Sequence, residues 1–412
     1  MKYTLLLIQI LTLIVNKVTQ VSLSFWVYDY TKSITIFSFI TVLLLLPALF
    51  GSFVFAKIPS IINLPKIIGL SNIISSITFF CLWLIFYESN HKLLILVYIL
   101  FFLLVFTSGF QLVALSSYNS EVFIDKRLIK ANAIVEAGIG VSNLISYPIA
   151  AIYYNQQKLQ MIFFYSTYVY FLAGVICIFL VKYYKRLKLI NNDIVNFGYF
   201  QGIKYVYTRK ELKLLFILVI IYSFFSGGSS NLITILFIER AHHFFGYLLS
   251  MIAVGSIFIS ILQLLYPTIL QYLYKLYIVY IPVIFAINIT LSYVDSYLIV
   301  GILLFCMGGV ISIISCTNTI LIQQHIPTYR KITLSTYKSV NWLFLGIGQV
   351  LIGFCMEYAF SFYFCKGISE PKCLSYFLAG INILALVSYY FVIYFFDFKL
   401  LSSLNMVKQN ES

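Results

Sequence analysis

Three ionisable side chains interrupt long apolar runs of this 412-residue sequence: Lys17, Glu136 and Lys338. A charged side chain near the centre of a bilayer-spanning helix costs about 2.5–3.5 kcal/mol on insertion scales, so each one needs a partner or a task. Glu136 is the only carboxylate well inside such a run. Burial disfavours its charged form and a nearby cation favours it, so it can bind and release a proton. The alternative is a structural pair with Lys17, Lys130 or Lys338.

Lys17 lies 13 residues into the first apolar run, too deep for its ammonium to reach the headgroups easily. It can anchor an anionic or carbonyl-rich ligand, or balance a carboxylate. The alternative is a structural role, in a pair with Glu136 or with the polar neighbours Asn16, Thr19 and Gln20. Lys338 is different because it lies near the start of its run, where snorkelling to the headgroups also explains a lysine.

Composition identifies the elements that must position these residues. Hydrophobic residues make up 62% of the chain and charged residues 10%, far from the balance of a soluble domain. Runs of about 20 apolar residues match the hydrocarbon thickness as helices, and no period-two pattern of barrel strands is present. We therefore predict an all-α polytopic membrane protein with about twelve spans, over residues 4–27, 34–56, 67–87, 93–116, 131–152, 161–181, 214–238, 245–270, 277–294, 297–322, 333–357 and 376–396.

The basic residues are distributed unevenly between alternate loops. Nineteen of the 27 lysines and arginines fall in the loop set that contains both termini, and six fall in the opposite set. Positively charged loops are retained in the cytoplasm, so both termini are predicted to be cytoplasmic. The net charge of +14 therefore reflects membrane topology, and we expect the lipid bilayer, not nucleic acid, as the partner.

The longest connection divides the chain into two halves of six spans. We predict an N-terminal half over residues 1–181, a cytoplasmic linker over 182–213, a C-terminal half over 214–396 and a cytoplasmic tail over 397–412. The segments SEVFIDKRLIKANAIVEAGIG and QQHIPTYRKITLSTYKSVNWLFLGIG occupy corresponding places in the two halves. Two related halves with a site between them at mid-membrane are typical of secondary transporters.

Several motifs carry a resemblance to a known family. They are Gly51 after LLPALF, DKRLIKAN, ISYPIAA around Pro148, and the run TNTILIQQHIP, Arg330-Lys331, STYKSVNW and LGIG. In these motifs the chain resembles the major facilitator superfamily, and within it the macrolide-efflux-like drug exporters. The resemblance departs from the family pattern at AKIPSIINLPK, the loop between the second and third spans, which has no acid, and at Asn16, where the family often has Asp.

The resemblance implies two six-helix pseudo-repeats and a secondary transporter, with export of amphipathic compounds as its function. It also implies a monomer in a bacterial plasma membrane, driven by protons or another coupling ion. The cationic Lys17 and the altered loop leave open import of an anionic metabolite, and a non-transporting scaffold or receptor. Besides Lys17, Glu136 and Lys338, the candidate substrate or coupling residues are Asn16, Gln20, Gln111, Asn143, Asn231, Asn318 and Asn341, each of which can instead bond a neighbouring helix.

Signatures of other chemistry are missing from the sequence. It has no Walker loop, Gly-x-Ser-x-Gly, Cys-x-x-Cys or His-Glu-x-x-His motif, so we expect no enzyme activity and no cofactor. His242 and His243 have only Glu239 nearby, which is too few ligands, and we expect no metal site. Cys365 and Cys373 share a predicted external loop and either form a disulfide in an oxidising compartment or remain free thiols.

Overall fold

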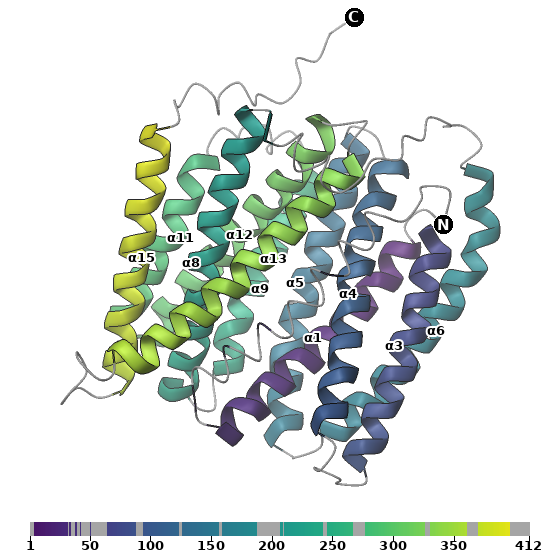
Figure 1. Cartoon of the computed structure of the whole chain (residues 1–412), viewed down its shortest axis with the longest axis horizontal. Coiled ribbons are helices and arrows are strands. Elements are labelled where there is room, and N and C mark those ends of the chain that lie inside the picture. Colours follow the sequence, from purple (N-terminus) through teal and green to yellow (C-terminus); the bar gives the residue numbers. More distant parts are fainter. Residues whose placement is uncertain are drawn as a thin grey trace, which may run out of the picture.

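The fold is a bundle of long helices, seen in a computed structural model (Figure 1). The structure describes residues 4–31, 33, 38, 42, 50, 64–87, 94–122, 126–155, 159–187, 207–208, 210–241, 245–266, 277–325, 330–360 and 370–395. Among them no strand occurs, and the α-helices are α1 (Thr4–Thr31), α3 (Leu64–Tyr87), α4 (Leu94–Val122), α5 (Lys126–Asn155), α6 (Leu159–Leu187), α8 (Lys210–Ala241), α9 (Phe245–Leu265), α11 (Tyr277–Tyr293), α12 (Tyr297–His325), α13 (Arg330–Phe354) and α15 (Glu370–Phe395). A π-helical segment, η3 (Cys355–Phe360), follows α13.

The helices follow the predicted spans and confirm the all-α membrane fold. Eleven of the predicted spans coincide with a described helix, and the second, 34–56, lies outside the described residues except at positions 38, 42 and 50. Eight described helices are long and apolar enough to cross a membrane. Large apolar side chains are exposed on the outermost helices, including Phe179 on α6 and Phe395 on α15. Lipid, which solvates such surfaces, is the environment that this composition requires.

Each half of the chain has its own arrangement and its own core. The helices of the C-terminal half, from the teal α8 to the yellow α15, lie on one side of Figure 1, and those of the N-terminal half, from the purple α1 to the teal α6, lie on the other. Packing pairs recur six spans later: α1 packs on α5 as α8 packs on α13, and α3 packs on α6 as α11 packs on α15. This recurrence is the six-plus-six repeat that the sequence predicts. The exact domain boundaries stay predictions, because most of the 182–213 linker lies outside the described residues.

Glycines allow the closest helix crossings in the C-terminal half. At the crossing of α8 and α13, a Cβ on Gly227 would overlap the Leu345 carbonyl, and one on Gly348 would overlap the Phe224 carbonyl. Successive contacts along this crossing advance in the same direction on both helices, so α8 and α13 run parallel. Small residues take this role in membranes because van der Waals packing replaces the hydrophobic effect between helices.

The two halves meet where α5 packs on α9 and α12, and where α13 packs on α4. Gly140 of α5 lies against Ile257 and the Ala253 carbonyl of α9. Tyr147 of α5 packs against the apolar core of the C-terminal half. In the N-terminal half, α5 therefore makes the most extensive contact with the other half, and it also carries Glu136.

Candidate functional site

Glu136 joins the two halves through a short hydrogen bond. The hydroxyl of Ser315 on α12 donates to Glu136 Oε1 at 2.7 Å. Both side chains are half-buried. A donor this close to a carboxylate forms a charge-assisted bond, which is roughly twice as strong as a neutral one. The only acid well inside the predicted spans is thus held by a residue that lies 179 positions away in the chain.

Lys338 of α13 supplies the positive charge beside this carboxylate. Glu136 and Lys338 act on each other electrostatically, and the Lys338 Nζ also lies 5.6 Å from the ring centre of Tyr337. Snorkelling to the headgroups is therefore not the only explanation for Lys338, because Glu136 interacts with it electrostatically inside the bundle. The electrostatic partner and the hydrogen-bond donor of Glu136 thus come from two helices of the C-terminal half, α13 and α12.

A buried amide borders the same cluster. Asn318 lies one turn beyond Ser315 on α12 and is 2% exposed, and its side chain bonds to that of Tyr337. Its Oδ1 has no hydrogen-bond partner among the described residues. An unpaired buried acceptor costs about 1–3 kcal/mol. Asn318 thus retains an acceptor that can bind a donor from a solute or from water.

Lys17 lies away from this cluster. It is half-buried on α1, and no ion pair or hydrogen bond of its ammonium is found in the part of the chain that the structure describes. Its neighbour Asn16 is 8% exposed and donates to the Ser108 hydroxyl of α4 at 2.7 Å. Gln20, one turn further on α1, is half-buried. The Lys17–Glu136 pair, one of the structural alternatives, is not formed.

Gln111 is the centre of an amide network inside the N-terminal half. Its Nε2 donates to Asn72 at 2.8 Å and to Ser71 at 2.9 Å, and its Oε1 accepts from Gln9 at 3.2 Å. The side chain is 1% exposed. The network ties α1, α3 and α4 together, which is the interhelical alternative for a polar residue in a span. A contact of Gln111 with substrate stays a prediction.

Three other predicted asparagines occupy different surroundings. Asn341 of α13 accepts from the Ser223 hydroxyl of α8 at 2.6 Å, within the C-terminal half. Asn231 of α8 is buried, donates to Ser38 at 3.4 Å and thereby reaches the first half. Asn143 of α5 is half-buried, and its side-chain amide makes no hydrogen bond with another described residue.

Only one cysteine of the predicted pair, Cys373, lies among the described residues. Cys373 takes part in a disulfide, and Cys365 lies outside the described residues, so the pairing of the two stays a prediction. His242 and His243 also lie outside them. Within the described ranges, no group of three or more His, Cys, Asp or Glu side chains is placed to hold a metal ion.

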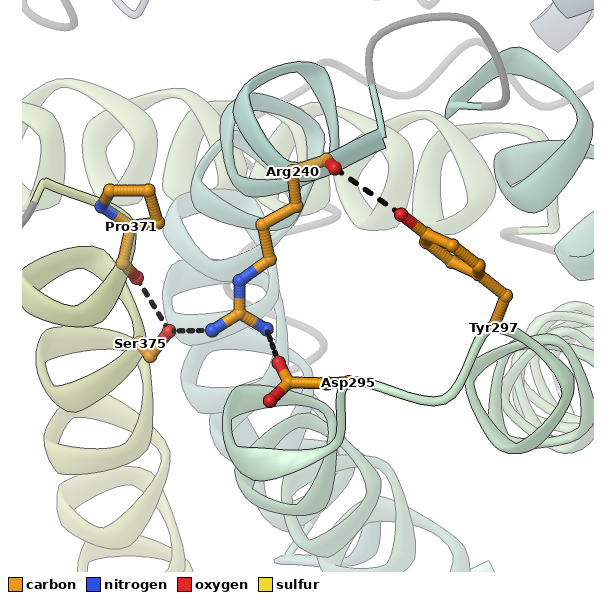
Figure 2. Close-up of polar contacts among 5 residues, drawn as sticks. All are labelled: Arg240, Asp295, Tyr297, Pro371 and Ser375. Carbon is orange, nitrogen blue, oxygen red and sulfur yellow. Dashed lines mark hydrogen bonds and ion pairs between the residues drawn. The ribbon is translucent and has the colours of Figure 1, made fainter.

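A polar cluster that the sequence reading missed joins three helix ends of the C-terminal half (Figure 2). Arg240, at the end of α8, donates to the Ser375 hydroxyl of α15 at 2.7 Å and pairs with Asp295 at 3.4 Å. The Tyr297 hydroxyl donates to the Arg240 carbonyl at 3.4 Å. The side-chain partners of Arg240 lie 55 and 135 residues away in the chain, so no local sequence pattern indicates this cluster.

Two further residues escaped prediction at the boundary between the halves. Ser315 carried no signal because most serines in spans bond their own helix, as Ser223 does to Val219. Glu357, in η3, is the last residue of the predicted span 333–357, so it does not stand out as a charge inside an apolar run. Its two carboxylate oxygens accept from the Ser33 hydroxyl at 2.9 and 3.1 Å, which links η3 to the residues that follow α1.

The sequence matches the family model described as Major Facilitator Superfamily over residues 5–351. This chain belongs to the major facilitator superfamily. The matched range includes α5, α12 and α13, the helices that bring Glu136, Ser315 and Lys338 together. Membership makes the chain a multi-pass membrane protein of a transporter family and points away from an enzyme. No curated protein matches it.

Solved structures of the same fold are distant in sequence. One is a POT family transporter in complex with 5-aminolevulinic acid, with 13% identity, a TM-score of 0.65 and coverage of 95% of each chain. A POT family transporter in complex with a thioalcohol conjugated peptide has 13% identity and a TM-score of 0.62, over 94% of this chain and 96% of that one. A bacterial homologue of the iron transporter ferroportin, in an outward-facing state with soaked iron, has 14% identity and a TM-score of 0.64, over 95% of this chain and 99% of that one. At these identities the likeness concerns the fold.

Proposed function

We propose that this major facilitator superfamily member is a secondary transporter that moves a small solute by alternating access and exports amphipathic compounds. In this proposal it works as a monomer in a bacterial plasma membrane, with both termini in the cytoplasm. The observation that carries it is the Glu136–Ser315 hydrogen bond, because it connects the N-terminal half to the C-terminal half inside the bundle.

Such a contact suits a rocking mechanism for a physical reason. When two halves rotate against each other, a 2.7 Å bond between them must break, and the carboxylate loses a donor in a poorly hydrated place. A proton on Glu136, or a solute beside it, then lowers the free energy of the separated state. Binding and rotation become coupled through this difference between the two states.

The direction of transport is supported by the resemblance to drug exporters at the tenth and eleventh spans. A second candidate, import of an anionic metabolite, is favoured by a specific observation: the ammonium of Lys17 has no carboxylate partner in the described part of the chain. A non-transporting scaffold or receptor is the third candidate, and complete absence of flux in a folded preparation supports it.

The test is a flux assay in proteoliposomes over a panel of amphipathic solutes, with and without a pH gradient. We expect Glu136→Gln to abolish pH-driven transport while solute exchange across the membrane continues, because the amide cannot bind and release a proton. Asp295→Asn is the matched control, since it neutralises an acid that is 89% exposed at a helix end. An unchanged pH dependence in Glu136→Gln would remove this residue from coupling.

A further inference from the structure

Two lysines and two glutamates lie inside the predicted spans, but only one of the lysines has an acid beside it. Glu136 faces Lys338 and accepts from Ser315, so this pair is locally compensated. The predicted spans contain one other carboxylate, Glu357, at the last residue of the eleventh, where Ser33 donates to it. Lys17 has no carboxylate partner in the part of the chain that the structure describes, so its charge is not compensated locally.

The depth of Lys17 follows from helix register. Hydrogen bonds pair Gln9 with Gln111 and Asn16 with Ser108, so α1 and α4 run antiparallel. α5 follows α4 after a short connection and packs against it, and so α5 runs parallel to α1.

Gly138 of α5 lies against Ile10 of α1. Seven residues further along each helix, Lys17 is level with Ile145. Glu136 is then about 13 Å away along the bundle axis, at a rise of about 1.5 Å per residue. Lys17 and Glu136 are thus separate charged positions at different depths.

The surface of α1 beside Lys17 is apolar and only partly covered. Ile10, Leu13 and Ile14 precede Lys17 by seven, four and three residues, so they share its helix face, and all three are half-buried. Ile145, at the same level on α5, is 36% exposed. Asn16 does not compete for a ligand here, because its amide bonds Ser108. The face therefore combines one ammonium with an adjoining apolar strip.

We propose that the transported solute is an amphipathic anion, whose oxyanion group binds the Lys17 ammonium while its apolar body lies along Ile10, Leu13 and Ile14. This inference rests on the proposed function and names its substrate class. An ammonium offers three donors, and its attraction to an anion is much stronger in a low-dielectric interior than in water. A singly charged anion supplies the negative partner that Lys17 lacks among the described residues.

The test uses three probes that share one aromatic body: 2-naphthoate, 2-naphthamide and 2-naphthylmethylammonium. Equilibrium binding to the purified full chain is measured for wild type, Lys17→Met and Lys17→Arg. The matched control is Lys66→Met, which removes an exposed lysine from the first turn of α3. We expect wild type to bind naphthoate at least about tenfold more tightly than the other two probes.

Lys17→Met should weaken naphthoate binding by about 10- to 100-fold and leave naphthamide unchanged, while Lys17→Arg should retain anion preference. Equal binding of the three probes, absence of naphthoate binding, or unaltered affinity in Lys17→Met overturns the inference. Flux in proteoliposomes distinguishes a failure of the anion inference from a failure of the proposed transport function. If neutral or cationic probes are transported and naphthoate is not, the inference fails and transport stands; if no solute of any charge moves, the proposed function itself fails.

Discussion

Removal of the Ser315 hydroxyl tests whether the contact between the halves controls their relative position. In Ser315→Ala the 2.7 Å bond to Glu136 is lost. A hydrogen bond to a charged group contributes about 1.5–3 kcal/mol. Lys338 remains as an electrostatic partner, and both bonded side chains are half-buried, so the lower end of the range applies. About 1.5 kcal/mol corresponds to a roughly tenfold shift in the equilibrium between conformations.

The shift can be measured as a distance distribution between spin labels on the two halves. Lys66 and Val279 are exposed residues in the first turns of α3 and α11, on different halves and at the predicted cytoplasmic end. Because Ser315 holds the halves together at that end, we expect the population with the longer distance to rise about tenfold relative to the shorter one.

Ser312→Ala is the matched control for Ser315→Ala. It makes the same substitution one turn earlier on α12, where the hydroxyl bonds Ser260 of α9 at 3.1 Å, inside the C-terminal half. This variant should leave the distance distribution unchanged. Our reasoning is refuted if Ser315→Ala behaves like Ser312→Ala. It is also refuted if the effect of Ser315→Ala is equally large in a Glu136→Ala background, since each of these two changes removes the same bond.

Two further predictions concern stability. In Gly348→Ala the new methyl group meets the Phe224 carbonyl, so the melting temperature of the purified protein should fall by an amount that corresponds to about 1–3 kcal/mol. Gly380→Ala should not lower it, because no atom lies within 4 Å of the new group. Equal melting temperatures of the two variants would contradict the close crossing of α8 and α13. Asp295→Asn should change the melting temperature little, because an ion pair of Arg240 with a carboxylate that is 89% exposed contributes at most about 1 kcal/mol; a large loss would show that we underrate this pair.

The spans were predictable because each depends on local composition. A helix such as α9 needs only its own 21 residues and a lipid environment to satisfy its backbone. The helix ends were less predictable. α5 begins at Lys126 and α12 ends at His325, beyond the apolar runs, because backbone hydrogen bonding continues where hydropathy has fallen.

The candidate site was predictable only in part, because a sequence shows which residues are unusual but not what they face. Glu136, Lys338 and Lys17 stood out as charges in apolar runs. The choice between their partners needed helix register and crossings between distant segments. Ser315 is an ordinary residue by type, and only the approach of α12 to α5 makes it a donor to a carboxylate.

The sequence by itself determined the membrane class, the spans, the two related halves and the few charged residues inside them, because these follow from composition and from the cost of burying charge. Tertiary structure alone decided that Glu136 bonds the opposite half, that Gln111 belongs to an amide network in its own half, and that Lys17 stands about 13 Å from Glu136 along the bundle. The physical reason is that hydrogen bonds and charge pairs act over a few ångströms between helices that are far apart in the chain, and no local pattern encodes that distance.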